Sequence, residues 1–200
     1  MRKIEKAIII ALILSVIIGS FSAFASDCRN IRNSVLRLHI LANSDSAEDQ
    51  ALKLKVRDRI LSETQALFQA TDDLVDAENK VSASMDLVKQ IAVDEIQKQG
   101  YFYDVQVELC NMYFGTRKYD GIALPAGSYD AMRVTIGEGK GQNWWCVLYP
   151  PLCIPAAQPT RELKDVLSPS ETEIVTSQSK YEIRFACVEL WERLKEAIRK

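Results

Sequence analysis

The chain has 200 residues, of which 48% are hydrophobic and 26% are charged, and its net charge is −2 at pH 7. This composition is typical of a globular protein that can bury a core, and the length favours one domain. Because no basic cluster is visible, the sequence argues against nucleic acid as a partner, since binding phosphates requires clustered lysine and arginine.

The N-terminus has the pattern of an export signal. Basic residues precede the apolar run AIIIALILSVIIG, and Ala23-Phe24-Ala25 is a small-x-small site for signal peptidase. This predicts cleavage after Ala25. The run is also almost long enough to remain as a membrane anchor, and the basic end stays in the cytoplasm in either case. We expect residues 1–25 to be a signal peptide or an anchor, and residues 26–200 to be one extracytoplasmic domain with a short polar lead.

The segment LRLHILANSDSAEDQALKLKVRDRIL, residues 36–61, predicts a strand, a polar turn and a capped helix. Apolar residues alternate up to Ala42, and the short polar side chains of Asn43–Ser46 then favour a turn and a helix N-cap. Ser46 with Asp49, or Asp45 with Glu48, predicts a variant of the capping box. A second helix should follow a cap at residues 71–73 and end before Gly100.

Period-two alternation then predicts strands at 101–114, 122–124, 129–136 and 144–149, with a polar turn at 115–121 and a glycine-rich hairpin connection at 137–142. Residues 150–170 hold most of the prolines and predict a long loop with helical turns near 161–167. Tyr181, Ile183 and Phe185 alternate as a short final strand. A C-terminal helix should then bury a stripe formed by Cys187, Leu190, Trp191, Leu194 and Ile198.

The resulting order, β-α-α-β-β-β-β-β-α, predicts an α+β fold. Its mostly antiparallel sheet should carry helices on one face, and the apolar N-terminal helix should lie outside the fold.

Five cysteines lie beyond the apolar run, where disulfides can form. Cys146 and Cys153 flank VLYPPL and could close a short loop, or remain reduced as small apolar residues. Cys28 falls in the polar lead. The odd number leaves at least one cysteine unpaired or bonded to another chain.

Signals for catalysis are weak. His39 is the only histidine, and no G-x-S-x-G nucleophile turn is present. An exported hydrolase or metal-dependent enzyme would have to use His39, Asp45 and Glu48, although helix capping already explains the two acids. The sequence GEGKG at 137–141 lacks the Lys-Ser or Lys-Thr of a phosphate loop. We therefore expect no catalytic residue, cofactor or metal.

Trp144 and Trp145 are adjacent in a predicted strand and should point to opposite faces. One of them could be exposed beside the Pro150-Pro151 loop, as in a protein-binding hot spot, or both could be buried under helices.

Two long segments carry a family resemblance. HILANSDSAEDQALKLKVRD, from His39, and LPAGSYDAMRVTIGEGKGQNWWCVLYPPLC, from Leu124, resemble the two signatures of the stage II sporulation protein R family. The resemblance implies a non-catalytic signal exported from the forespore into the space between forespore and mother cell. It implies one partner, a membrane-embedded aspartic protease of the mother cell in the septal membrane, which processes the sigma-E precursor.

On this basis we predict that the family motifs contact the receptor. The candidate contact residues are His39, Asn43, Ser44, Asp45, Ser46, Asp49, Trp144 and Trp145.

Overall fold

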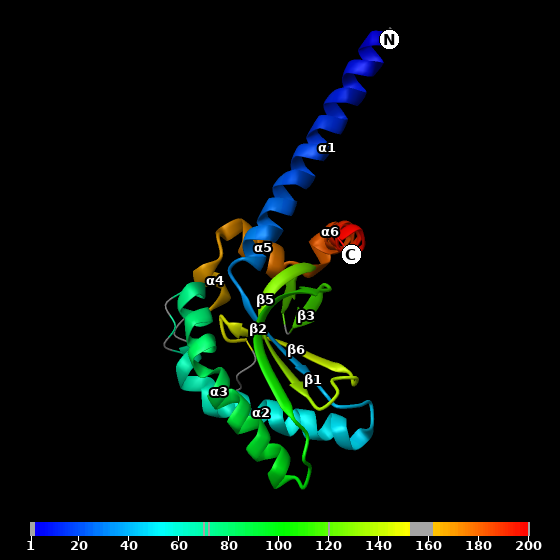
Figure 1. The fold of residues 1–200 in the computed structure, drawn as a ribbon. Coiled ribbons are helices and arrows are strands. Elements are labelled where there is room, and N and C mark those ends of the chain that lie inside the picture. Colours follow the sequence, from blue (N-terminus) through cyan, green and yellow to red (C-terminus); the bar gives the residue numbers. More distant parts are fainter. Residues whose placement is uncertain (1–2, 70, 72, 120, 153–161, 200) are drawn as a thin grey trace. The chain divides into compact units, whose positions relative to one another are not determined.

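The computed structural model describes residues 3–69, 71, 73–119, 121–152 and 162–199. These residues form two compact units (Figure 1). Unit 1 contains Met1–Asn33, Phe114–Gly127 and Ser168–Lys200. Unit 2 contains Ser34–Tyr113 and Ser128–Leu167. The domain limits predicted from the sequence, with a boundary after residue 25, stay a prediction.

Unit 2 is built on a four-stranded sheet. Its strands are β1 (Leu36–Leu41), β2 (Val105–Phe114), β5 (Gly127–Ile136) and β6 (Asn143–Tyr149), in the order β2-β5-β1-β6. Strand β1 runs parallel to β5 and antiparallel to β6. Because β1 lies between β5 and β6, these two strands do not pair. The segment 137–142 is therefore not the predicted hairpin connection, and instead crosses over the end of β1.

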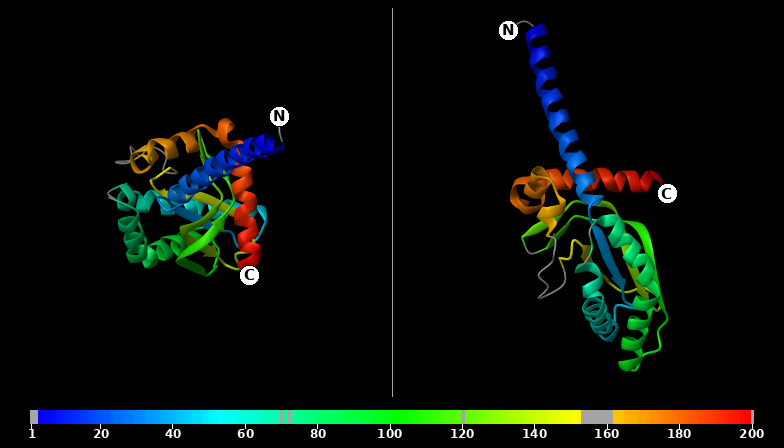
Figure 2. Two further views of the ribbon diagram at one scale, coloured as in Figure 1. Left: turned by 90° about the horizontal axis from the view of Figure 1, so that it is seen from above. Right: turned by 90° about the vertical axis from the view of Figure 1, so that its left-hand side faces the viewer.

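Two long helices cover one face of this sheet, α2 (Ala47–Gln69) and α3 (Leu74–Lys98) (Figures 1 and 2). Alternate residues of β1, such as Leu38 and Ile40, are fully buried against apolar residues of α2 such as Val56. The four-stranded sheet and the two helices therefore share one hydrophobic core. The short helix α4 (Leu163–Val166) contributes Val166 to its edge.

The ends of α3 follow from local chemistry. The Asp73 side chain accepts a hydrogen bond from the Asp76 N–H and caps the first turn. After the helix, Gly100 has a φ of +84°, a conformation that glycine adopts at little cost. Both boundaries agree with the prediction. The strand β1, the helix α2 and the α+β class were also predicted.

Unit 1 contains α1 (Lys3–Arg32), α5 (Pro169–Thr176), α6 (Gln178–Arg199) and a small antiparallel pair, β3 (Arg117–Tyr119) with β4 (Ile122–Leu124). Strand β3 lies within the segment that was predicted to be only a turn. Helix α5 was not predicted. It begins with a capping box formed by Ser168 and Glu171.

The predicted polar lead at 26–33 is wrong, because α1 continues to Arg32. Its apolar first part is exposed, whereas Phe24, Cys28 and Ile31 are buried. The Phe24 ring stacks on Tyr181 at 5.6 Å between ring centroids. The end of the apolar helix thus belongs to the packing of unit 1.

The predicted final strand is also wrong, because Tyr181 and Phe185 lie four apart on one side of α6 and are buried. The stripe of α6 that was predicted to be buried, from Cys187 to Ile198, is exposed. Over this short segment, the apolar residues fit both the alternation of a strand and the four-residue spacing of a helix. The packing of Phe24 against Tyr181 and Phe185 identifies the side of the helix that is buried.

Phe24→Ala should loosen α6. Removing a buried phenylalanine costs about 3–5 kcal/mol, so the α6 amides should exchange hydrogen faster by about 100-fold or more when opening of this helix limits exchange. The measurement is hydrogen–deuterium exchange of the full chain in detergent micelles. Phe21→Ala is the matched control, because Phe21 is 37% exposed on the same helix. Equal exchange in both variants would contradict the packing role of Phe24.

Candidate functional site

The structure brings the two family-like segments together at one end of the unit 2 sheet. The loop at 42–46 leaves the end of β1, and the loop at 137–142 crosses over that end. Backbone hydrogen bonds join them, from Lys140 N to Asn43 O at 3.1 Å and from Gly141 N to Ala42 O at 3.0 Å. We call these two segments the paired loops.

Asn43 and Asp49 form the centre of the hydrogen-bond network that holds the paired loops. The Asn43 side-chain oxygen accepts a hydrogen bond from Glu138 N at 3.0 Å, and its amide group donates to Asp49 at 2.9 Å. The Ser44 hydroxyl donates to the same Asp49 oxygen at 2.6 Å. Burial alone would raise the pKa of Asp49, but hydrogen bonds from Ser44, Asn43 and Tyr103 outweigh it and lower that pKa below its usual value.

A second set of contacts ties the start of α2 to the crossing loop. The Asp45 carboxylate accepts a hydrogen bond from Gln142 N at 2.6 Å. Lys53 donates to the Gln142 carbonyl at 2.7 Å and to the Gln50 side chain at 2.7 Å. Ser46 caps α2 by accepting from Asp49 N at 3.1 Å, which confirms the predicted cap. The polar groups of this turn therefore hold the loops in place.

The glycines of GEGKG allow the two loops to approach each other this closely. Gly137 has a φ of +58°, and a Cβ atom there would overlap the Asn43 side chain. At Gly141 a Cβ atom would overlap the Ser44 backbone carbonyl. These glycines allow the crossing loop to lie directly on the turn after β1.

His39 stacks against a tryptophan on the sheet face opposite the α2–α3 core. Its ring stacks on Trp145 with 4.1 Å between centroids and an interplanar angle of 3°. Its Nε2 lies 2.6 Å from the Asn143 side-chain oxygen. Burial, together with the positive charges of Arg133 and Lys53, lowers the pKa of His39 below its ordinary 6.5 despite the Asn143 hydrogen bond. The ring is therefore neutral at pH 7.

Trp144 points to the other face of the sheet, as predicted. It packs against the hydrophobic core, and the Arg57 guanidinium lies over its ring at 4.9 Å. Both tryptophans are half-buried, so neither is a fully exposed anchor. Cys146 is buried and disulfide-bonded. Its predicted partner Cys153 lies outside the described residues, so the pairing itself stays a prediction.

The predicted contact residues thus divide into two groups. Buried or half-buried residues that hold the structure together form the first group: His39, Asn43, Ser44, Asp49, Trp144 and Trp145. Asp45 and Ser46 are exposed. Sequence reasoning missed the neighbours that complete the exposed surface, because the sequence pattern does not show that β6 pairs with β1. These neighbours are Glu138, Gln142 and Asn143, and Lys140 is exposed among them.

The three residues of the alternative enzyme reading have separate environments. His39 is bound to Asn143, Asp45 is bound to Gln142 N, and Glu48 is exposed in the first turn of α2. Among the described residues, no three His, Cys, Asp or Glu side chains gather so that they could hold a metal ion. The expectations about catalysis and cofactors stay predictions.

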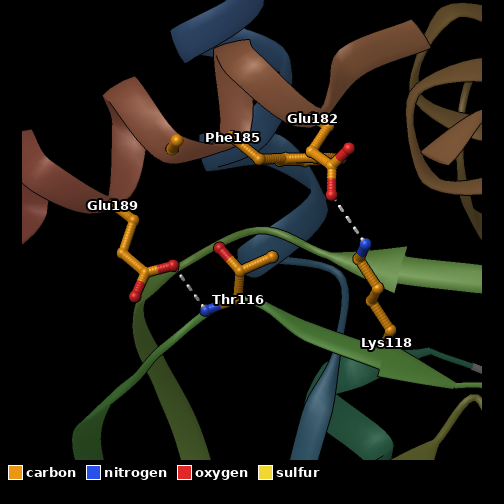
Figure 3. A pocket seen from close by; sticks show the side chains of 6 residues that line it. Thr116, Lys118, Glu182, Phe185 and Glu189 are labelled. Atoms are coloured by element: carbon orange, nitrogen blue, oxygen red, sulfur yellow. Dashed lines mark hydrogen bonds and ion pairs between the residues drawn. The ribbon is translucent and has the colours of Figure 1, made fainter. Parts of the chain in front are cut away.

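Unit 1 has a shallow hollow between β3 and α6 (Figure 3). Its polar groups bind one another: Lys118 pairs with Glu182 at 3.1 Å, and Thr116 N donates to Glu189 at 3.3 Å. These contacts hold α6 on the strand pair.

The molecule is therefore an α+β protein with an apolar N-terminal helix and hydrogen-bonded paired loops at one end of its sheet. The family model for stage II sporulation protein R matches residues 32–158, which include both loops. The chain belongs to the stage II sporulation protein R family, and this gives it a role in sporulation.

A curated relative, stage II sporulation protein R of Bacillus subtilis (strain 168), is 37% identical over 123 residues. The match covers 62% of this chain and 55% of that protein, so it spans little more than half of the relative's length. No solved structure matches the chain.

His39 gives a direct pH test, because it is the only histidine. As the pH falls below 6.5, the unfolded ring gains a proton that the folded ring does not bind, so the free energy of unfolding should decrease. The stabilisation is complete above pH 6.5 and is lost as the pH falls through the lower pKa of the folded ring. NMR titration of the single imidazole measures this pKa, and His39→Gln should remove this part of the pH dependence. A ring that titrates at or above 6.5 contradicts the buried neutral state.

Proposed function

We propose that this chain is an exported sporulation signal that activates, by binding, the septal-membrane aspartic protease that processes the sigma-E precursor. The observation that carries the proposal is the family match, which spans both halves of the paired loops. The apolar helix α1 is long and apolar enough to cross a membrane, which supports export. A signal sequence and an anchor share this composition.

Activation by binding requires a difference in affinity. A ligand shifts a protease towards its active state only by as much as it binds that state more tightly than the inactive one. A rigid surface meets this requirement better than a mobile one, because less conformational freedom is lost on binding. The network around Asn43 and Asp49 supplies that rigidity in the paired loops.

We place the receptor contact on the exposed rim of the paired loops. The rim carries charged and amide groups whose backbone is fixed by the buried network, and Lys140 with Glu138 forms an ion pair on it at 2.7 Å. The rim consists of exposed residues of the paired loops, Asp45, Ser46, Glu138, Lys140 and Gln142, and of two exposed residues next to them, Glu48 and Asn143.

We also propose that α1 is retained as an anchor. Phe24 precedes the predicted cleavage site after Ala25, and it is 2% exposed and packed on Tyr181 and Phe185. Cleavage would remove this ring from unit 1 and expose the two rings that it covers. Retention leaves the folded part outside the cell that makes it, attached to that membrane.

Lys140→Glu should reduce processing of the sigma-E precursor in sporulating cells. Reversing one charge on an interface rim lowers affinity by about tenfold when it meets a complementary charge. The matched control is Lys89→Glu, the same change at an exposed position of α3. Immunoblots report processing and the amount of each variant. Normal processing by Lys140→Glu would contradict the placement of the contact on the rim. Failure of the unaltered chain to restore processing in a strain lacking this protein would contradict the proposed function itself.

The N-terminus in sporulating cells tests the anchor. Intact mass of the purified protein should include residues 1–25, and the protein should remain in the membrane fraction after washing with high salt and alkali. A mature chain that begins at Ser26 would show that α1 is a cleaved signal.

A further inference from the structure

Helix α6 has two apolar faces. The inner face, with Tyr181, Phe185 and Val188, is buried in unit 1. The second, which we call the outer face, is exposed, and its side chains retain between 49% and 84% of their accessible surface. The outer face consists of Ile183, Leu190, Trp191, Leu194 and Ile198. So large an apolar surface along one helix marks an interaction site.

The polar contacts of α6 fix the direction of the outer face. Glu182 binds Lys118 in β3, and Glu189 binds the backbone N–H of Thr116 just before this strand (Figure 3). Trp191 follows Glu182 by nine residues, and Ile198 follows Glu189 by the same interval. Nine residues are about two and a half helical turns, so these apolar residues lie on the side of α6 opposite β3.

Helix α6 also meets α1 at the point where the exposed apolar surface of α1 ends. Phe21 is 37% exposed, whereas Phe24 is 2% exposed and contacts Tyr181 and Phe185. The segment from Ile4 to Phe21 is about 27 Å long as a helix, close to the hydrocarbon thickness of a bilayer. Helix α6 runs crosswise to α1 (Figures 1 and 2).

We propose that α6 is an interfacial helix, and that its outer face lies in the surface of the membrane that α1 crosses. A helix that crosses α1 at the end of its membrane-spanning part must lie close to the headgroup region. The exposed apolar surface of α1 ends at Phe21, beside this crossing, so a bilayer that covers α1 has its surface next to α6. This position favours lipid over a second copy of the chain or a partner protein as the occupant.

The side chains around the outer face suit this position. Trp191 is the type of aromatic residue that settles between headgroups and acyl chains. The Lys195 ammonium lies 6.0 Å from the centre of the Trp191 ring and pairs with Glu192 at 2.7 Å. Arg184 lies over the rings of Phe24 and Tyr181, where α6 meets the end of α1. Long basic side chains can extend from such a helix to anionic headgroups. Glu182 and Glu192 pair with Lys118 and Arg32, so these acids are neutralised within unit 1.

The test places the full chain, with α1 verified by mass, in nanodiscs whose lipids carry bromine on the acyl chains. Brominated lipid should quench most of the Trp191 emission, more strongly when the bromine is near the headgroup than when it is near the chain end. The Trp191→Phe variant separates this signal from Trp144 and Trp145 and should lose the quenched part. Its ring is 57% exposed, so the substitution leaves the fold intact.

Two further variants make the result specific. Leu194→Glu introduces a charge on the outer face and should reduce quenching of Trp191, whereas Glu182→Gln on the opposite side should leave it unchanged. If brominated lipid does not quench Trp191, the proposal is overturned. Shielding of Trp191 only on self-association, or only on addition of the septal protease, would also overturn it and assign the face to that protein contact.

Discussion

The structure of unit 2 depends on the order of its strands. Because β1 lies between β5 and β6 and runs parallel to β5, the chain must pass over the end of β1 to enter β6. This crossing brings two backbone segments into contact. Their N–H and C=O groups lose hydrogen bonds to water there and need partners within the protein. Asn43 and Asp45 accept hydrogen bonds from N–H groups of the crossing loop, and Asp49 holds the Asn43 and Ser44 side chains. Gly137 and Gly141 provide the space. The two family-like segments are thus joined by one structural requirement.

The sequence predicts the parts of the fold that local chemistry determines. Leu38 and Ile40 alternate in β1, Asp73 caps α3, and Gly100 ends it, so these elements could be placed from residue spacing alone. The start of α5 had a visible signal too, the capping box between Ser168 and Glu171, which was not used. What spacing does not show is which strands become neighbours. The hairpin prediction for 137–142 failed for this reason.

The same limit explains the error in α6. Tyr181 and Phe185 fit both a strand with alternate burial and a helix with a four-residue repeat, and the segment is too short to separate the two. The longer stripe from Leu190 to Ile198 is strongly helical, but periodicity shows only that it is apolar on one side. It does not show what covers that side. At the candidate site, the sequence predicted the polar residues as one set, whereas their division into inward groups such as Asp49 and outward groups such as Asp45 required the structure.

The proposed membrane attachment would change how strong the proposed receptor contact has to be. The rim of the paired loops is polar and contains no fully exposed tryptophan, and such a surface alone typically gives modest affinity. Under the two membrane proposals above, a chain held by α1 and α6 would stay at the membrane, and its local concentration near a receptor in the facing membrane would be high. Linked attachment of this kind strengthens overall binding without any new contact at the interface. For the proposed signal, a small, rigid, polar rim would then be sufficient for binding.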